Sequence, residues 1–430
     1  MANDVTRRIG LSLGADICWP RCFEDLVARW NPTFEIDGTT VGFEVDRVRI
    51  EPFNLQGPIN YDLVIDRLTH WYANTREWIK KAVILDDLYV FNNPWSVQSM
   101  EKQTTYCAMM RLGLKIPETM MIPAKEYDQS DDLEPTLERY ANMFDLTNVG
   151  EQLGYPMFMK PYDGGGWRGV SKIDDSEALK AAYEGSGKFL MHLQKGVVPY
   201  DNFVRCIGIG PQTRVVEYDP DAPLHERYTT EYDHLAEADM AHIRAITLTI
   251  NTFFGWDFNS CESLGQGGSW YPIDFANPCP DSQVTSLHRH FPWLVLSKLK
   301  WSLFCAATRR PFRKNLNWQP FFDIASTDAI YEEKVKAYGA LAEAHFDSKR
   351  FDEFCHDHMS ELDEVAYEYF ATEECKDAVR EKVTALFPEH EVEEFTERFW
   401  SAIDDWRTEE SAAGANALTT TASATVVESE

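Results

Sequence analysis

The chain has 430 residues, of which 44% are hydrophobic and 26% charged, so it is not disordered as a whole, and its length predicts one to three domains. Its 41 basic and 70 acidic residues give a formal net charge of −29 at pH 7, which disfavours partners such as nucleic acid or an anionic membrane surface. Nine cysteines without a CxxC pair favour reduced thiols in a cytoplasmic protein over a disulfide framework.

The first part of the chain alternates strand-like and helical segments, which predicts a mostly parallel, covered sheet. The expected strands are residues 8–14, 41–53, 61–68 and 88–91, and the expected helices are residues 23–30 and 71–85. The sequence therefore favours an α/β fold class for this part of the chain.

The middle of the chain combines short apolar strands with a few helices. Helices are expected at 97–112, where Gly113 ends the pattern, at 176–183 with Ser176 as N-cap, and at 236–253. Strands are expected at 116–123, 154–161, 189–193, 203–209 and 214–218, followed by a hairpin of 259–264 and 270–277. This order predicts further sheets after the N-terminal one.

Beyond Ser282 the pattern becomes helical. The most apolar window, 291–307, contains Lys298 and Lys300, which favours a buried amphipathic helix over a membrane span. Apolar residues recur at helical spacing from Val392 to Trp406, and the Ala/Thr/Ser/Glu-rich end of the chain is expected to be a disordered tail.

The first candidate for chemistry is the glycine run Gly164, Gly165 and Gly166, which follows a strand that ends near Lys160. Glycines let a loop place its backbone N–H groups on phosphate oxygens, and a lysine in front of the loop adds a point charge. The alternative is a plain turn.

The second candidate is a set of oxygen ligands on the predicted hairpin, formed by Glu262, Asp274 and Asn277. Magnesium prefers one or two carboxylates next to substrate phosphates, so this set predicts a metal site. Solvent-facing acids on an acidic protein are the alternative. Lys102 near a helix start is a third candidate, and an exposed surface lysine is its alternative.

The order and spacing of these segments resemble the ATP-grasp superfamily over roughly residues 61–280, about half of the chain. The matching segments, in chain order, are Asn93-Pro-Trp-Ser-Val-Gln-Ser-Met-Glu-Lys102, Leu112-Gly-Leu-Lys-Ile-Pro-Glu-Thr119, Gly154-Tyr-Pro-Met-Phe-Met-Lys-Pro161, Glu262-Ser-Leu264 and Ile273-Asp-Phe-Ala-Asn-Pro278. The first segment is similar to the family's entry helix, and the second to the glycine–proline–threonine stretch that follows this helix. The third is similar to the nucleotide-covering hairpin, and the last two to the magnesium-binding strands. The resemblance is to the carboxylate–amine or carboxylate–thiol ligases, such as the ATP-binding domains of glutathione synthetase and ribosomal-protein glutamate ligase.

The resemblance implies an α+β grasp fold with appended domains. The expected parts are a Rossmann-like pre-ATP-grasp domain at 1–98, a two-lobed ATP-grasp domain at 99–285, a helical C-terminal region at 286–408 and a disordered tail at 409–430. The lobes of the ATP-grasp domain are expected at about 99–190 and 191–285.

The resemblance also implies roles for individual residues toward ATP and Mg²⁺, with Mn²⁺ as an alternative metal. Lys102 and Lys160 would contact the ATP phosphates, and Gly164 to Gly166 with Arg168 and Gly169 would form the lid. The backbone of Met191, His192 and Leu193 would hydrogen-bond adenine, and Leu264 would pack on the base. Glu262, Asp274 and Asn277 would hold the metal.

Many members of the superfamily carry an acid for the ribose at the hinge between the two lobes. Here the hinge segment, residues 191–195, lacks such an acid, and Gln194 or Asp201 could take its place.

Arg205 lies where glutamate-adding members of the superfamily carry an arginine, so the resemblance implies that it steadies a developing acyl phosphate, with Lys160 as a second catalytic residue. His288 and His290 near a helix start could touch substrate, and a structural role for both is the alternative.

The sequence thus predicts an ATP- and Mg²⁺-dependent ligase that activates a substrate carboxylate as an acyl phosphate and joins it to an amine or thiol. Its partners would be small-molecule carboxylate and amine substrates, and a homodimer is left open. The alternatives are an ATP-grasp phosphotransferase and a non-catalytic nucleotide-binding module.

Overall fold

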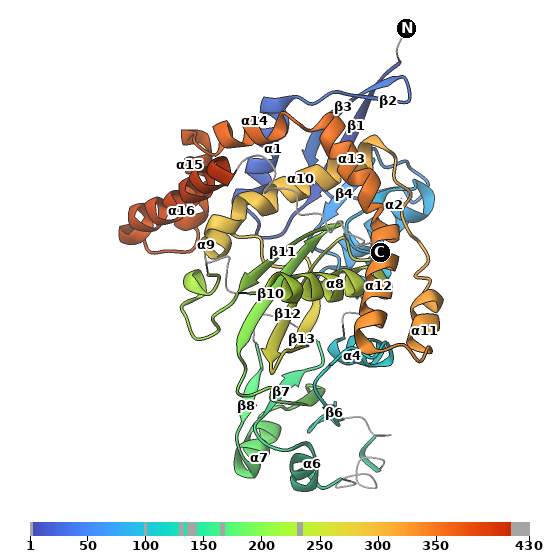
Figure 1. Ribbon diagram of the computed structural model, residues 1–430, viewed down its shortest axis with the longest axis vertical. Coiled ribbons are helices and arrows are strands. Elements are labelled where there is room, and N and C mark those ends of the chain that lie inside the picture. The colour runs from blue at the N-terminus through green and yellow to red at the C-terminus, as the bar shows by residue number, and fades with distance from the viewer. Residues whose placement is uncertain are drawn as a thin grey trace, which may run out of the picture. The chain divides into compact units, whose positions relative to one another are not determined.

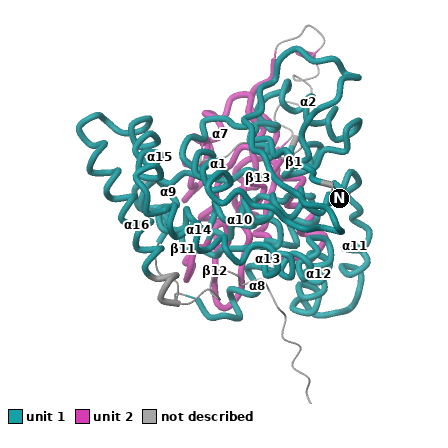
Figure 2. Tube along the Cα trace, turned by 90° about the horizontal axis from the view of Figure 1, so that it is seen from above, with its two compact units in different colours: residues 1–99, 205–260, 278–430 teal, residues 100–204, 261–277 magenta. Residues whose placement is uncertain are grey.

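A computed structural model describes residues 3–98, 101–128, 133–135, 144–163, 168–229 and 235–413 (Figure 1). The chain divides into two compact units (Figure 2), the first comprising residues 1–99, 205–260 and 278–430 and the second residues 100–204 and 261–277. Both units combine helices with strands, so the predicted α/β class is confirmed.

The first unit begins with a five-stranded sheet in the order β2-β3-β1-β4-β5. The strands are β1 (Asn3–Ser12), β2 (Phe34–Ile36), β3 (Thr39–Arg47), β4 (Leu63–Asp66) and β5 (Tyr89–Val90). β1 pairs in parallel with both β3 and β4, and only β2 at the edge is antiparallel. The predicted parallel sheet is therefore confirmed, although β1 starts earlier than expected and leaves Gly14 in the following loop.

Helices pack on this sheet, and its strand β4 is buried along its whole length, as expected for a parallel strand with both faces covered. α1 (Cys18–Trp30) buries a stripe that includes Cys22, Phe23 and Leu26, and it ends at Asn31, which adopts a left-handed conformation with φ 46°. α2 (Ala73–Leu85) packs Ile79 and Val83 against Val64 of β4. α3 (Pro94–Gln98) starts at a proline, whose fixed φ suits a first helical position.

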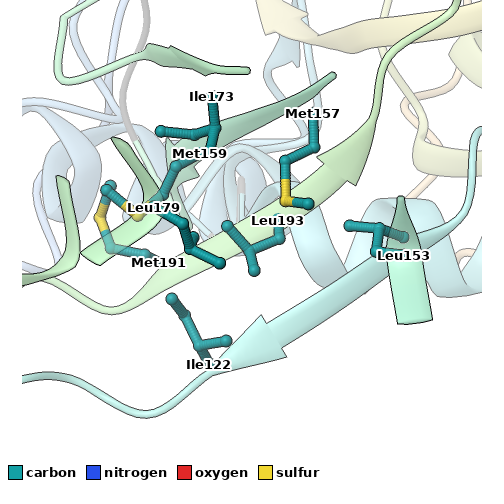
Figure 3. Close-up of a cluster of buried hydrophobic side chains, with 8 residues drawn as sticks. All are labelled: Ile122, Leu153, Met157, Met159, Ile173, Leu179, Met191 and Leu193. Atoms are coloured by element: carbon teal, nitrogen blue, oxygen red, sulfur yellow. The ribbon is translucent and has the colours of Figure 1, made fainter. Parts of the chain in front are cut away.

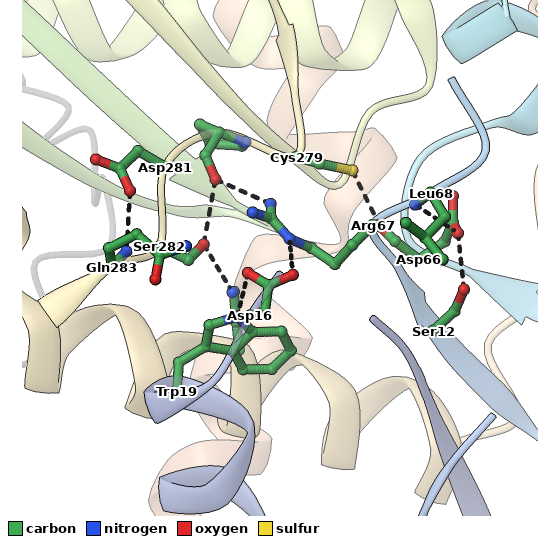
Figure 4. Close-up of polar contacts among 12 residues, drawn as sticks. Ser12, Asp16, Trp19, Asp66, Arg67, Leu68, Cys279, Asp281, Ser282 and Gln283 are labelled. Atoms are coloured by element: carbon green, nitrogen blue, oxygen red, sulfur yellow. Dashed lines mark hydrogen bonds and ion pairs between the residues drawn. The ribbon is translucent and has the colours of Figure 1, made fainter. Parts of the chain in front are cut away.

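A buried polar network fixes the loops that follow β1 and β4 (Figure 4). The Arg67 guanidinium lies 3.2 Å from the Asp16 carboxylate and donates a hydrogen bond of 2.9 Å to the carbonyl of Pro280. Lys298 donates to Ser282 and lies 3.6 Å from the centroid of the Trp19 ring. Burial raises the pKa of Asp16, but Arg67 and Lys298 outweigh this effect and hold it below its usual value. The network thus ties the segment after residue 277 to the N-terminal sheet.

The remainder of the first unit is largely helical, as predicted. Its helices are α8 (Glu237–Phe254), α9 (Val284–Leu287), α10 (Phe291–Ala307), α11 (Gln319–Ala325), α12 (Tyr331–Phe346), α13 (Ser348–His358), α14 (Leu362–Tyr369), α15 (Glu373–Thr384) and α16 (Val392–Ala413), with short 3₁₀ turns η1 (Leu224–Glu226), η2 (His288–His290) and η3 (Glu389–Glu391).

Two of these helices differ from the predictions made from the sequence. Every residue of α10 is buried, so the helix is enclosed on all sides rather than amphipathic. α16 continues to Ala413, past the expected start of the tail at 409, and residues 414–430 lie outside the described part of the chain. Among the described residues, no helix has both the length and the apolar character needed to cross a bilayer.

The second unit contains a four-stranded sheet in the order β6-β9-β7-β8. Its strands are β6 (Thr119–Ile122), β7 (Met157–Pro161), β8 (Ser171–Ile173) and β9 (Met191–Lys195). Alternate residues of an antiparallel strand point to opposite faces. One face carries an apolar cluster (Figure 3) to which α6 (Leu146–Leu153) and α7 (Ser176–Glu184) contribute Leu153 and Leu179.

The other face of this sheet carries polar side chains. Lys160 of β7 is directly opposite His192 of β9, and Gln194 of β9 is opposite Thr119 of β6. Directly opposite residues of paired strands share a face. One face of the sheet therefore builds a core while the other collects polar groups.

A third sheet has the order β11-β10-β12-β13, with strands β10 (Asn202–Ile209), β11 (Gln212–Glu217), β12 (Phe258–Gln266) and β13 (Ser269–Pro278). The predicted hairpin of β12 and β13 is confirmed. The chain passes from one unit to the other within β10, β12 and β13.

Two local predictions need correction, and one helix of the second unit was not expected. The helix expected at 97–112 is two helices, α3 and α4 (Lys102–Arg111), with residues 99 and 100 outside the described part. Asp175 rather than Ser176 is the N-cap of α7, because its carboxylate accepts the Ala178 N–H at 2.8 Å. α6 was not expected from the sequence; the Asp145 side chain caps it.

We expect Gly210→Ala to destabilise the first unit more than an ordinary glycine substitution. Gly210 has φ +55°, and a Cβ there would lie 2.4 Å from the ring of the buried Trp301. The combined backbone strain and overpacking should lower the free energy of unfolding by about 3 kcal/mol.

Urea unfolding followed by circular dichroism measures this loss. Gly38→Ala is the matched control, because Gly38 has φ +76° but a Cβ added there would have no atom within 4 Å, so only about 1 kcal/mol of strain is expected. Equal losses in the two variants would contradict the role assigned to Trp301.

Candidate nucleotide and metal site

Lys102 and Asp274 form an ion pair within the second unit. Lys102 is the first residue of α4, is only 5% exposed, and donates its backbone N–H to the carbonyl of Tyr162 at 2.8 Å. Both its backbone and its ammonium group are therefore fixed. The alternative of an exposed surface lysine is wrong.

Lys160 projects from β7 toward β13, the strand that contains Asp274. Its ammonium donates to the side-chain oxygen of Gln194 at 2.7 Å and to the carbonyl of Ile273, next to Asp274, at 3.3 Å. Burial lowers the pKa of Lys160 to about 8; Asp274 opposes this effect and the neighbouring Lys102 adds to it. The structure thus places both lysines next to Asp274, and their contact with the phosphates of ATP stays a prediction.

The predicted metal ligands also gather in this unit. Asn277 donates its side-chain amide to the Asp274 carboxylate at 3.2 Å, so these two predicted ligands are in contact. Glu262 is buried, and its charge acts on both Lys160 and Tyr106. Two carboxylates and an amide oxygen are hard ligands of the kind that Mg²⁺ prefers, so the residues fit the ion.

No group of three or more His, Cys, Asp or Glu side chains in the described residues is arranged to hold a metal on its own. A site with two carboxylates is instead typical of a cation that is shared with substrate phosphates.

His192 lies beside the two lysines and is fully buried. Neither of its ring nitrogens has a hydrogen-bond partner in the part of the chain that the structure describes. Burial, together with the charges of Lys160 and Lys102, lowers its pKa to about 3. The imidazole is thus a neutral group beside two cations, and its ring meets that of Tyr106 edge to face at 5.5 Å.

The adenine contact expected from the backbone of residues 191–193 is wrong for this stretch. β9 is a central strand, and these residues are paired with β6 on one side and with β7 on the other. Their peptide groups are therefore used in the two ladders. The strand ends at Lys195, and the next peptide N–H, that of Gly196, donates to the carbonyl of Pro156.

The other predicted site residues belong to several different segments. Leu264 is buried in β12, Arg168 is exposed, and Gly169 adopts φ +72° with Pro161 too close for a Cβ. Gly164, Gly165 and Gly166 lie outside the described residues. Arg205 belongs to the first unit, where its guanidinium lies against the rings of Tyr218 and Tyr228 at 5.5 and 5.6 Å and donates to the Tyr228 hydroxyl.

Gln194 makes other contacts than the sequence suggested, and Tyr106 was not identified from the sequence. Gln194, considered for ribose, instead accepts from Lys160 and donates to Thr119 at 3.1 Å. Tyr106 was missed. It lies four residues after Lys102, so the helical repeat puts both on one face, and its hydroxyl donates to the carbonyl of Ile273 at 2.7 Å.

Comparison with known proteins found no matching family model. A curated D-alanine–D-alanine ligase from Dechloromonas aromatica (strain RCB) is 31% identical over 115 residues, which are 26% of this chain and 32% of that protein. The chain therefore spans about a third of the length of this relative.

Two solved structures illustrate the similarity in fold. One is a RimK domain protein ATP-grasp from Sphaerobacter thermophilus, with a TM-score of 0.44, 14% identity, and coverage of 68% of this chain and 97% of that one. The other is a D-alanine–D-alanine ligase from Bacillus anthracis complexed with ATP, with a TM-score of 0.46, 14% identity, and coverage of 70% and 98%.

We expect Gln194→Glu to raise the pKa of Lys160 above its present value of about 8. The substitution puts a carboxylate in place of a neutral amide within hydrogen-bond distance of a buried ammonium, which favours the charged form. Titration of the ¹³C-methylated lysine by NMR measures the shift.

Gln212→Glu, on β11 of the first unit, is the control and should leave the titration of Lys160 unchanged. A Lys160 pKa that stays the same in Gln194→Glu would show that the two side chains are not in contact.

Proposed function

We propose that the protein is an ATP- and Mg²⁺-dependent carboxylate–amine ligase, with a thiol as the alternative nucleophile. A substrate carboxylate would attack the γ-phosphorus of ATP to form an acyl phosphate and ADP. The nucleophile would then attack the acyl carbon, lose its proton, and release inorganic phosphate. The proposal is supported above all by the convergence of Lys102 and Lys160 on Asp274 within one unit.

The two lysines would contact the phosphates. Asp274 neutralises Lys102, and because Lys102 is buried, its charge depends on a nearby counter-charge. A triphosphate offers Lys102 an alternative set of oxygens, so the ammonium can leave Asp274 without losing a counter-charge. Lys160 stays anchored to Gln194 and supplies a fixed positive charge.

The exchange would free the Asp274 carboxylate for the metal. Glu262, Asp274 and Asn277 would hold Mg²⁺, which when bound neutralises charge on the phosphates. Arg205 would steady the charge of the acyl phosphate, since a guanidinium can meet a phosphate with two hydrogen bonds. The local match to a D-alanine–D-alanine ligase supports a ligase, while the acid and the nucleophile that are joined belong to the proposal.

We expect Lys102→Ala and Asp274→Ala each to lower ADP release by about 100-fold or more, because each removes a charge that acts on the phosphates or the metal. The assay mixes full-length protein with ATP, Mg²⁺ and pools of carboxylic and amino acids, and follows ADP. Lys314→Ala is the control, because Lys314 only pairs with the exposed Asp87. Wild-type rates in both site variants would remove this assignment, and nucleotide binding without ADP from any pool would favour a non-catalytic module.

We expect Arg205→Ala to lower turnover by about 100-fold and to keep ATP affinity within about twofold, since its role is in the chemical step. The measurements are kcat and the Kd of ATP, with Arg350→Ala on the surface of α13 as control. Thermal unfolding shows whether Tyr218 and Tyr228 remain packed without the guanidinium. A stable variant with normal turnover would exclude the catalytic role.

A further inference from the structure

Tyr106 lies within the candidate site, and the proposed function gives it no role. Its side chain is buried, and its hydroxyl donates a hydrogen bond of 2.7 Å to the carbonyl of Ile273. Ile273 directly precedes Asp274, one of the proposed metal ligands, on β13. The tyrosine thus holds the peptide group next to the ligand, and its effect on a metal ion passes through the backbone of β13.

The carbonyl of Ile273 belongs to an edge strand. In the part of the chain that the structure describes, β13 is the last strand of the order β11-β10-β12-β13, and such an edge presents carbonyls that no ladder uses. The Ile273 carbonyl accepts from the Lys160 ammonium at 3.3 Å as well as from Tyr106. A carbonyl oxygen has two lone pairs, so these two donors fill its capacity. Side chains of α4 and β7 thus fix the edge of β13 next to Asp274.

The position of the Tyr106 hydroxyl is set by packing. Its ring meets that of Phe275 edge to face at 5.3 Å and that of His192 edge to face at 5.5 Å. Burial and the charge of Asp274 raise the pKa of Tyr106 well above its usual value, so the hydroxyl keeps its proton and donates at neutral pH. The hydrogen bond is therefore present throughout the physiological pH range.

This hydrogen bond complements the ion pair of Lys102 with Asp274. Tyr106 and Lys102 lie about one turn apart on α4, and both contact β13. In the proposed function Lys102 leaves Asp274 for the phosphates. The hydrogen bond of Tyr106 uses the backbone of β13 and not the carboxylate, so it persists when the ion pair opens and still links α4 to β13.

We propose that Tyr106 is a positioning residue of the metal site, whose hydroxyl fixes the peptide between Ile273 and Asp274 so that the carboxylate is in place when the cation binds. Removal of a group that orients a metal ligand typically weakens metal binding by about 10- to 100-fold. The inference rests on the proposed function, because it assigns Tyr106 to the metal site named there.

Binding of Mn²⁺ tests this role without turnover. Electron paramagnetic resonance of the free ion gives the Kd of Mn²⁺ for the full-length protein in the presence of a non-hydrolysable ATP analogue. Tyr106→Phe removes the hydroxyl and keeps the ring, and we expect this Kd to rise by about tenfold. The Kd of the analogue measured in EDTA should change by less than about twofold, because Lys102 and Lys160 are retained.

Tyr183→Phe is the matched control. The Tyr183 hydroxyl also donates to a backbone carbonyl of the second unit, that of Pro123 at 3.1 Å, and neither residue belongs to the proposed site. This variant should leave the Kd of Mn²⁺ unchanged. Equal Mn²⁺ affinities of Tyr106→Phe and the wild type would overturn the role of Tyr106. Loss of metal and nucleotide affinity by the same factor would overturn it too, because it indicates a general disturbance of the unit.

The kinetics of ADP release separate positioning from a merely structural role. Tyr106→Phe should raise the KM for Mg²⁺ by about tenfold, while kcat at saturating Mg²⁺ stays within about twofold of the wild type. A kcat that excess Mg²⁺ does not restore would contradict positioning.

The two measurements also distinguish failure of this inference from failure of the proposed function. A wild-type protein that binds Mn²⁺ with the analogue but releases no ADP would reject the ligase reaction and leave the Mn²⁺ test of Tyr106 decisive. A wild-type protein that binds no Mn²⁺ would reject both.

Discussion

The second unit depends on the compensation of two buried lysine charges by carboxylates. Burial alone would drive Lys160 toward its neutral form, and the nearby ammonium of Lys102 acts in the same direction. Asp274 opposes both effects, and its ion pair with Lys102 keeps two cations close together in a poorly solvated place. An anion of higher charge than one carboxylate is the natural competitor for this position, and a triphosphate is such an anion.

The alternation of side chains along β7 and β9 makes this arrangement possible. Met159 and Leu193 enter the apolar cluster on one face, while Lys160 and Gln194 point to the other. The core therefore fixes the strands, and through them the polar groups, without contributing a charge. A shift of one residue in register would exchange the two faces, so packing and site geometry are specified together.

Much of this organisation could be predicted from the sequence because it follows local rules. The strand around Lys160, the hairpin with Asp274 and the helix stop at Gly113 are each encoded by periodicity or by a glycine. What could not be predicted depends on neighbours that are distant in sequence. The pairing of β9 on both sides and the contact of Gln194 with Lys160 exist only because β6, β7 and β9 come together. The error of one residue at the N-cap of α7 has a local cause, because both Asp175 and Ser176 are good N-cap residues.

The overall charge of −29 is compatible with binding of an anionic nucleotide, because the two effects act over different distances. At physiological ionic strength surface charges are screened beyond about 8 Å, so the acidic exterior acts weakly on a ligand inside a site. Buried charges such as Lys102 and Lys160 are screened much less and act at contact distance. A nucleic acid, in contrast, follows an extended part of the surface and meets its repulsion along the whole length. The same sequence can therefore disfavour a polyanion and still accommodate a nucleoside triphosphate.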